Sequence, residues 1–130
     1  MKKCNIILYV ESQERATSFY SNVLDRSPDL NVPGMTEFRL SNDVVLGLMP
    51  VAGIKRLLGS VLPDPHGAAG IPRAEIYLTV DRAGDYHQRA MKAGARELSP
   101  LSLRDWGDRA AYSLDPDGHV LVFAETLVTD

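Results

Sequence analysis

The sequence contains two copies of one pattern, offset by 70 positions, from Ile6 to Ile76. The apolar stretch "NIILYV" at 5–10 aligns with "EIYLTV" at 75–80, and three of the six aligned residues are identical. Each stretch is followed by an amphipathic segment and then by three short extended runs. A set of elements that recurs in the same order indicates internal duplication. Each copy is too small to bury both faces of a sheet, so we expect the chain to form a single domain over 1–130.

The segment after each apolar stretch has the spacing of a helix. In the first copy Ser12 is a suitable N-cap, and in the second copy Asp81 is. Gly94 is placed to end the second helix in a left-handed conformation. The apolar residues that recur at intervals of three and four are Ala16, Phe19, Tyr20, Val23 and Leu24 in the first copy and Ala83, Tyr86, Ala90 and Ala93 in the second.

Three extended runs close each copy. They are "DLNV", "TEFRL" and "VVLGLM" in the first and "RELSPL", "RAAYSL" and "HVLVFA" in the second. The order predicts an α+β fold of two tandem βαβββ modules, at 1–50 and 74–127. Residues 51–73 are rich in Gly and Pro and are expected to be a linker, with one or two helical turns around Ile54–Leu58.

Composition excludes several classes of protein. The net charge is −3 and no dense Lys/Arg cluster is present, so we expect no nucleic-acid partner. No apolar run approaches the roughly 18 residues of a membrane span, and the start of the chain does not have the pattern of a signal peptide. Cys4 is the only cysteine and is expected to be a small buried apolar residue. These features favour a cytoplasmic protein without membrane association.

The two modules, with "FYSNVLD" at the end of the first helix and "DPDGH" in the last hairpin, resemble the vicinal oxygen chelate superfamily. This superfamily includes glyoxalase, bleomycin-resistance proteins and extradiol dioxygenases. The resemblance covers nearly the whole chain. It implies curved mixed sheets around a cavity, and a homodimer in which each cavity is built from both modules.

Metal-dependent members of that superfamily place ligands at four positions, which correspond here to Asn5, Gly47, Glu75 and Val122. Only Glu75 is a good ligand, because glycine and valine offer no donor atom and an amide oxygen is a weak one. One carboxylate and one amide are too few for zinc, nickel or iron. We therefore expect no metal and no cofactor. His66, His87 and His119 have no metal-binding spacing either, and His119 is expected to have a structural role in the hairpin.

If the resemblance holds, strand alternation places Asn5, Tyr9, Glu75, Tyr77 and Val122 on the cavity face. Trp106 lies in "RDWGDR", a loop that borders the pocket in similar proteins, and a tryptophan there can stack on a planar ligand. The alternatives are that these residues only fill the core, that Glu75 is a solvated residue at a strand edge and that Trp106 only anchors its loop. The charged neighbours Arg104, Asp105, Asp108 and Arg109 are expected to be a solvated loop or a dimer contact.

The favoured function is reversible capture of a small, partly planar organic molecule, as in drug- or metabolite-sequestering proteins, without metal and with Trp106, Glu75, Asn5, Tyr9, Tyr77 and Val122 as ligand contacts. One alternative is a metal-independent isomerase, epimerase or lyase. Glu75 would then be the catalytic general base, made more basic by burial. Another alternative is a dimer without a ligand that regulates a partner protein.

Overall fold

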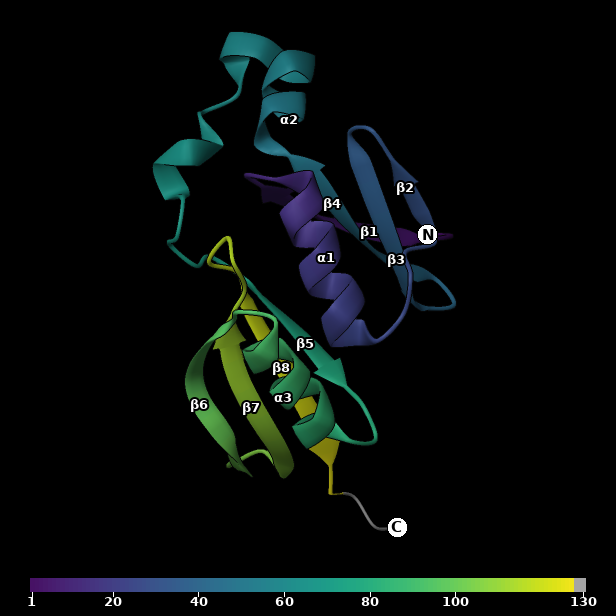
Figure 1. The fold of residues 1–130 in the computed structure, drawn as a ribbon, viewed down its shortest axis with the longest axis vertical. Coiled ribbons are helices and arrows are strands. Elements are labelled where there is room, and N and C mark those ends of the chain that lie inside the picture. The colour runs from purple at the N-terminus through teal and green to yellow at the C-terminus, as the bar shows by residue number, and fades with distance from the viewer. Residues whose placement is uncertain (128–130) are drawn as a thin grey trace. The chain divides into compact units, whose positions relative to one another are not determined.

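The computed structural model describes residues 1–127 and contains two four-stranded mixed sheets with three α-helices (Figure 1), which confirms the predicted α+β fold of two similar modules. In each sheet the first and last strands of the module pair in parallel, and the other pairs are antiparallel. The first sheet has the order β1 (Cys4–Val10), β4 (Val44–Pro50), β3 (Met35–Ser41), β2 (Leu30–Val32). The second has the order β5 (Glu75–Thr79), β8 (Val120–Thr126), β7 (Asp108–Leu114), β6 (Arg96–Leu103). The sheets are not closed into a barrel.

The chain divides into two compact units. The first unit is Met1–Ser21 with Asp25–Ala69, and the second is Asn22–Leu24 with Gly70–Asp130. The segment predicted as a linker contains the helix α2 (Val51–Leu58) and two short 3-10 turns, η1 (Gly59–Val61) and η2 (Pro65–Ala68). The eight residues of α2 make about two helical turns, in line with the turn or two that the sequence predicts, and the helix begins directly after β4, with Val51 and Ile54 buried. Of the domain expected over 1–130, residues 128–130 lie outside the described part.

Most of the helix α1 (Gln13–Leu24) belongs to the first unit. Ser12 caps this helix as predicted, with its hydroxyl accepting a hydrogen bond of 3.1 Å from the Arg15 N–H. Gln13 and Thr17 both bond to the buried hydroxyl of Thr36, which ties α1 to one face of the sheet. No helix within residues 1–127 combines the length and the apolar character that crossing a membrane requires.

The second unit packs α3 (Ala83–Lys92) on its sheet, where Tyr86 stacks on Phe123 with ring centroids 4.9 Å apart. The predicted cap at Asp81 is wrong. The carboxylate of Glu125, on β8, accepts the first helical N–H, that of Ala83, at 2.8 Å. The sheet therefore supplies the acceptor that helix starts require. Gly94 follows the helix with φ +106°, which confirms the predicted left-handed ending.

The hairpin between β7 and β8 is a closed turn. One carboxylate oxygen of Asp115 accepts hydrogen bonds from the backbone N–H groups of Asp117 and His119, both at 2.9 Å. Gly118 has φ +89°, and a Cβ at this position would lie only 2.7 Å from the Cα of Gly70. The turn thus requires glycine for its conformation and for its contact with the backbone at the start of the second unit.

Candidate functional site

Each sheet has one face under its helix and one face turned away from it, which we call the open face. On β8, Leu121 and Phe123 lie on the helix side, and Val122 lies on the open face. In the second unit the register aligns Tyr77, Val122 and Tyr112 across three adjacent strands of the open face. Val122 has no exposed surface because Tyr77 and Tyr112 pack over the small cluster to which it belongs.

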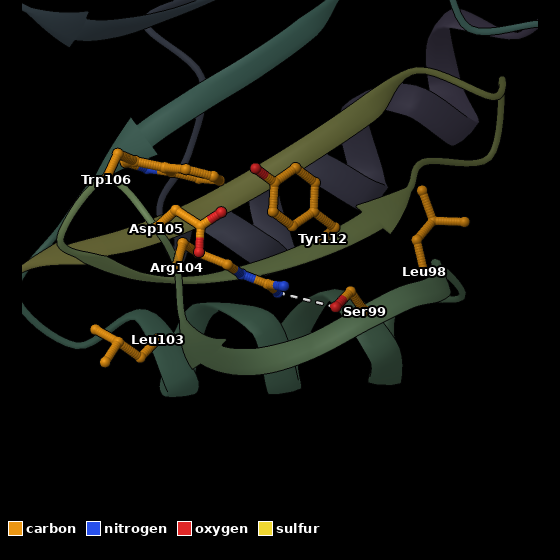
Figure 2. A pocket seen from close by; sticks show the side chains of 7 residues that line it. All are labelled: Leu98, Ser99, Leu103, Arg104, Asp105, Trp106 and Tyr112. Carbon is orange, nitrogen blue, oxygen red and sulfur yellow. Dashed lines mark hydrogen bonds between the residues drawn. The ribbon is translucent and has the colours of Figure 1, made fainter.

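A hollow of about 490 Å³ lies where the loop 104–107 joins β6 to β7 (Figure 2). Its walls combine aromatic, aliphatic and charged groups, and all of them belong to the second unit. Figure 2 shows Arg104 extending toward Ser99, with Asp105 and the Trp106 ring beside it. The lining residues are Leu98, Ser99, Leu103, Arg104, Asp105, Trp106 and Tyr112.

Arg104 lines this hollow and is fixed in place by several hydrogen bonds. Its Nη2 donates to the Ser99 hydroxyl at 2.9 Å, to the Pro100 carbonyl at 3.0 Å and to the Ala110 carbonyl at 2.7 Å, and its Nε also donates to Ala110. These carbonyls lie at an irregular part of the β6–β7 ladder, where the register shifts between Ser99 and Ser102. The guanidinium also lies over the Tyr112 ring, 5.1 Å from its centroid.

Trp106 is held at the mouth of the hollow by a chain of two hydrogen bonds. Its indole N–H donates to the Tyr77 hydroxyl oxygen at 2.8 Å, and that hydroxyl donates to the Asp108 carboxylate at 2.5 Å. The indole is therefore oriented although 57% of the residue surface is exposed. Burial, and then the bond to Asp108, raise the pKa of Tyr77 above its ordinary value.

The predicted ligand contacts fall into two groups. Trp106 and Tyr77 are directly bonded to each other, and Val122 packs beneath Tyr77. Glu75 begins β5 on the same open face and is exposed. The burial that the isomerase alternative requires of Glu75 is therefore not observed in the described structure.

Asn5 and Tyr9 lie on the open face of the first unit. The Asn5 amide donates to the Glu37 carboxylate at 3.4 Å, and 37% of Tyr9 is exposed. Glu37 is directly opposite Gly47 in the register, as Tyr112 is opposite Val122. The duplication therefore makes Glu37 the counterpart of Tyr112, an equivalence that the sequence analysis missed.

The sequence analysis also missed the roles of Arg104, Asp108 and Tyr112. It treated the charges of "RDWGDR" as a solvated loop or a dimer contact, whereas Arg104 bonds to three residues of its own unit and Asp108 orients Tyr77. One signal was available for Tyr112, because alternation along β7 places it on the open face beside Val122.

The residues at the metal positions of the resembled family do not fit a transition metal. Within residues 1–127, no group of three or more His, Cys, Asp or Glu side chains is arranged to hold a metal ion. At Gly47 a Cβ would lie 3.0 Å from Ile7 and 3.2 Å from Met35, so those side chains occupy the space of a ligand at that position. Val122 is buried and has no donor atom.

Comparison with known proteins agrees with this architecture. The family model for the glyoxalase/bleomycin resistance protein/dioxygenase superfamily matches residues 4–123. An uncharacterised protein of Mycobacterium bovis is 28% identical over an alignment of 120 positions that covers 86% of this chain and 75% of that protein. A crystal structure of a glyoxalase-related enzyme from Fulvimarina pelagi superposes with a TM-score of 0.79 at 21% identity, covering 95% of this chain and 86% of the other.

A glyoxalase/bleomycin resistance protein/dioxygenase from Nocardioides superposes with a TM-score of 0.75 at 18% identity, covering 100% of this chain and 85% of the other. At such identities the structural likeness shows the fold, whereas the family model covers most of the sequence itself. The chain belongs to the glyoxalase/bleomycin resistance protein/dioxygenase superfamily.

Proposed function

We propose that the protein reversibly binds a small, partly planar organic molecule in the hollow beside Trp106. The observation that carries this proposal is an exposed indole whose orientation is fixed by Tyr77 and Asp108 at the edge of that hollow. A fixed indole binds a flat ring with little loss of conformational freedom.

The size and chemistry of the hollow suit such a ligand. Its volume of about 490 Å³ lies within the range of small-molecule sites. Leu98 and Leu103 provide apolar contact, and Ser99, Arg104 and Asp105 provide a few polar groups. The mechanism we propose is capture by stacking and hydrogen bonding, with no bond made or broken, in a drug- or metabolite-sequestering role.

Two further parts of the proposal concern the assembly. We propose that binding requires no metal, since the donor set described above does not fit one. We also propose a homodimer, in which the ligand cavity is completed at the dimer interface. Apolar side chains exposed on the open face of the first unit, such as Ile7 and Val32, are suitable for contact with a second copy. Sedimentation of a monomer at all concentrations would refute the dimer.

The binding proposal is tested by calorimetric titration with quinoline, a neutral planar ring at neutral pH. We expect binding that is weakened about fivefold or more by Trp106→Ala, because stacking on an aromatic side chain contributes about 1–3 kcal/mol per ring. Leu57→Ala is the matched control, since it removes another exposed apolar side chain far along the sequence in α2. Equal affinity in the wild type and Trp106→Ala would refute a site at Trp106.

A further inference from the structure

The two charged side chains that line the hollow differ in how many hydrogen bonds they make to the protein. Arg104 is the only basic lining residue, and its Nε and Nη2 are bonded to oxygens of Ser99, Pro100 and Ala110. Asp105 is exposed, and within residues 1–127 its carboxylate has no hydrogen-bond or ion-pair partner. Arg104 keeps its positive charge, because its partners are neutral oxygens, but most of its donors are occupied by the fold. The oxygens of the Asp105 carboxylate, by contrast, remain available to a ligand.

A second carboxylate adds to the negative charge of this region. Asp108 accepts a hydrogen bond from the Tyr77 hydroxyl, which in turn accepts one from the Trp106 indole. Because the phenol is neutral, this bond does not cancel the negative charge of the carboxylate. Arg109, the next residue on β7, points to the opposite face of the sheet because side chains alternate along a strand. Next to the row of Tyr77, Val122 and Tyr112, the open face carries a row with Glu75 on one edge strand and Arg96 on the other, which adds one negative and one positive charge.

We infer that the hollow prefers cationic planar heterocycles to anionic ones, with Asp105 as the residue that determines this preference. This inference rests on the proposed function, because it specifies the ligand class of the same site. The ring would stack on Trp106, and its positive edge would face Asp105. An anion in that position would be repelled by the Asp105 carboxylate. Only Nη1 of Arg104, which has no bond to any residue of 1–127, would be available to donate a hydrogen bond to it.

The experiment compares three probes that share one ring: N-methylquinolinium, quinoline and a quinoline carboxylate. Affinities are measured by calorimetric titration at low and at high salt. We expect the cation to bind about fivefold tighter than the anion at low salt, as is typical of an exposed charge pair. We expect this ratio to shrink at high salt, because exposed charges are screened.

Two variants with the same change in net charge identify the source of the preference. Asp105→Asn is expected to lower the cation-to-anion affinity ratio about two- to threefold, and a change that affects all three probes equally cancels in this ratio. Asp81→Asn is the matched control, because Asp81 is an exposed carboxylate of the same unit that does not line the hollow. An equal loss in both variants would assign the effect to net charge and overturn the role of Asp105.

The failure of this inference can be distinguished from failure of the proposed function. If quinoline binds at Trp106 and the anion binds as tightly as the cation or tighter, only the charge preference is overturned. Anion binding that is lost in Arg104→Gln would then assign the hollow to anions. If none of the three probes binds, the proposed function fails as well.

Discussion

The open faces of the two sheets occupy equivalent positions of a duplicated module, yet they carry different chemistry. The register makes Ile7 the counterpart of Tyr77 and Gly47 the counterpart of Val122. In the first unit Gly47 lies under the side chains of Ile7 and Met35. In the second unit Val122 fills the same place itself and is covered by aromatic rings.

The helix-facing sides of the two sheets do not show this contrast. Leu46 and Leu48 in β4 correspond to Leu121 and Phe123 in β8, and all four are buried apolar residues. Packing under a helix imposes the same requirement on both modules, namely apolar side chains of suitable size. The two modules therefore differ on their open faces, which are not constrained by packing under a helix.

The largest expected effect comes from exchanging residues between the two faces. Val122→Gly should lower the free energy of unfolding by about 2–4 kcal/mol, since it leaves a cavity and adds backbone freedom to a strand. Gly47→Val should lower it by about 1–3 kcal/mol, because the new side chain must displace Ile7 and Met35. Urea unfolding measures both.

Thr79→Gly serves as the control for these two variants. Thr79 is an exposed residue of β5, so its replacement should cost only the strand penalty of glycine, about 0.5–1 kcal/mol. If Gly47→Val leaves the stability unchanged, the first face accepts a side chain at this position. The contrast between the faces would then not be imposed by packing.

A smaller effect is expected from removing the hydroxyl of Tyr77, since its counterpart on the first face is Ile7. Tyr77→Phe breaks the bonds to Trp106 and Asp108 and should cost about 0.5–1.5 kcal/mol. The indole of Trp106, the only tryptophan, should also become more accessible, so a soluble quencher should reduce its fluorescence more strongly. Tyr112→Phe is the matched control and should leave quenching unchanged. Similar quenching in Tyr77→Phe and the wild type would show that the hydroxyl does not orient the indole.

The smallest effect appears only in alkaline solution. Because the pKa of Tyr77 is raised on folding, the folded protein keeps this proton at pH values where the unfolded chain has lost it. The resulting stability is complete below about pH 10, the ordinary tyrosine value, and is lost as the pH rises through the folded-state pKa. Unfolding curves measured below and above this pH should therefore show that the free energy of unfolding falls more steeply with pH in the wild type than in Tyr77→Phe. Parallel losses would contradict the assignment.

The fold could be predicted from the sequence because its signals are local and repeated. Apolar periodicity located α1 and α3, and alternation assigned Val122 to the face turned away from the helix. The cap of α3 could not be predicted in this way. Its acceptor is Glu125, 42 positions from Ala83, and this proximity exists only after the sheet has formed.

The candidate site was predictable in part for the same reason. Trp106 stands out as the only tryptophan, and Tyr77 follows from alternation along its strand. Arg104, however, bonds mainly to main-chain carbonyls at an irregular part of the ladder. Neither a carbonyl nor a register shift has a residue-type signature, so the role of Arg104 could not be inferred from composition or spacing.

The contact between Gly118 and Gly70 has a consequence for anyone who wishes to insert a peptide tag into this protein. In the sequence, the turn around Gly118 and the turn around Gly34 are both short connections between strands. At Gly118 the backbone of Gly70 lies against the turn, whereas a Cβ on Gly34 would meet no atom within 4 Å. An insertion at Gly118 would have to push aside the chain that enters β5, the strand that carries Tyr77. The turn at Gly118 is therefore a poor position for a tag.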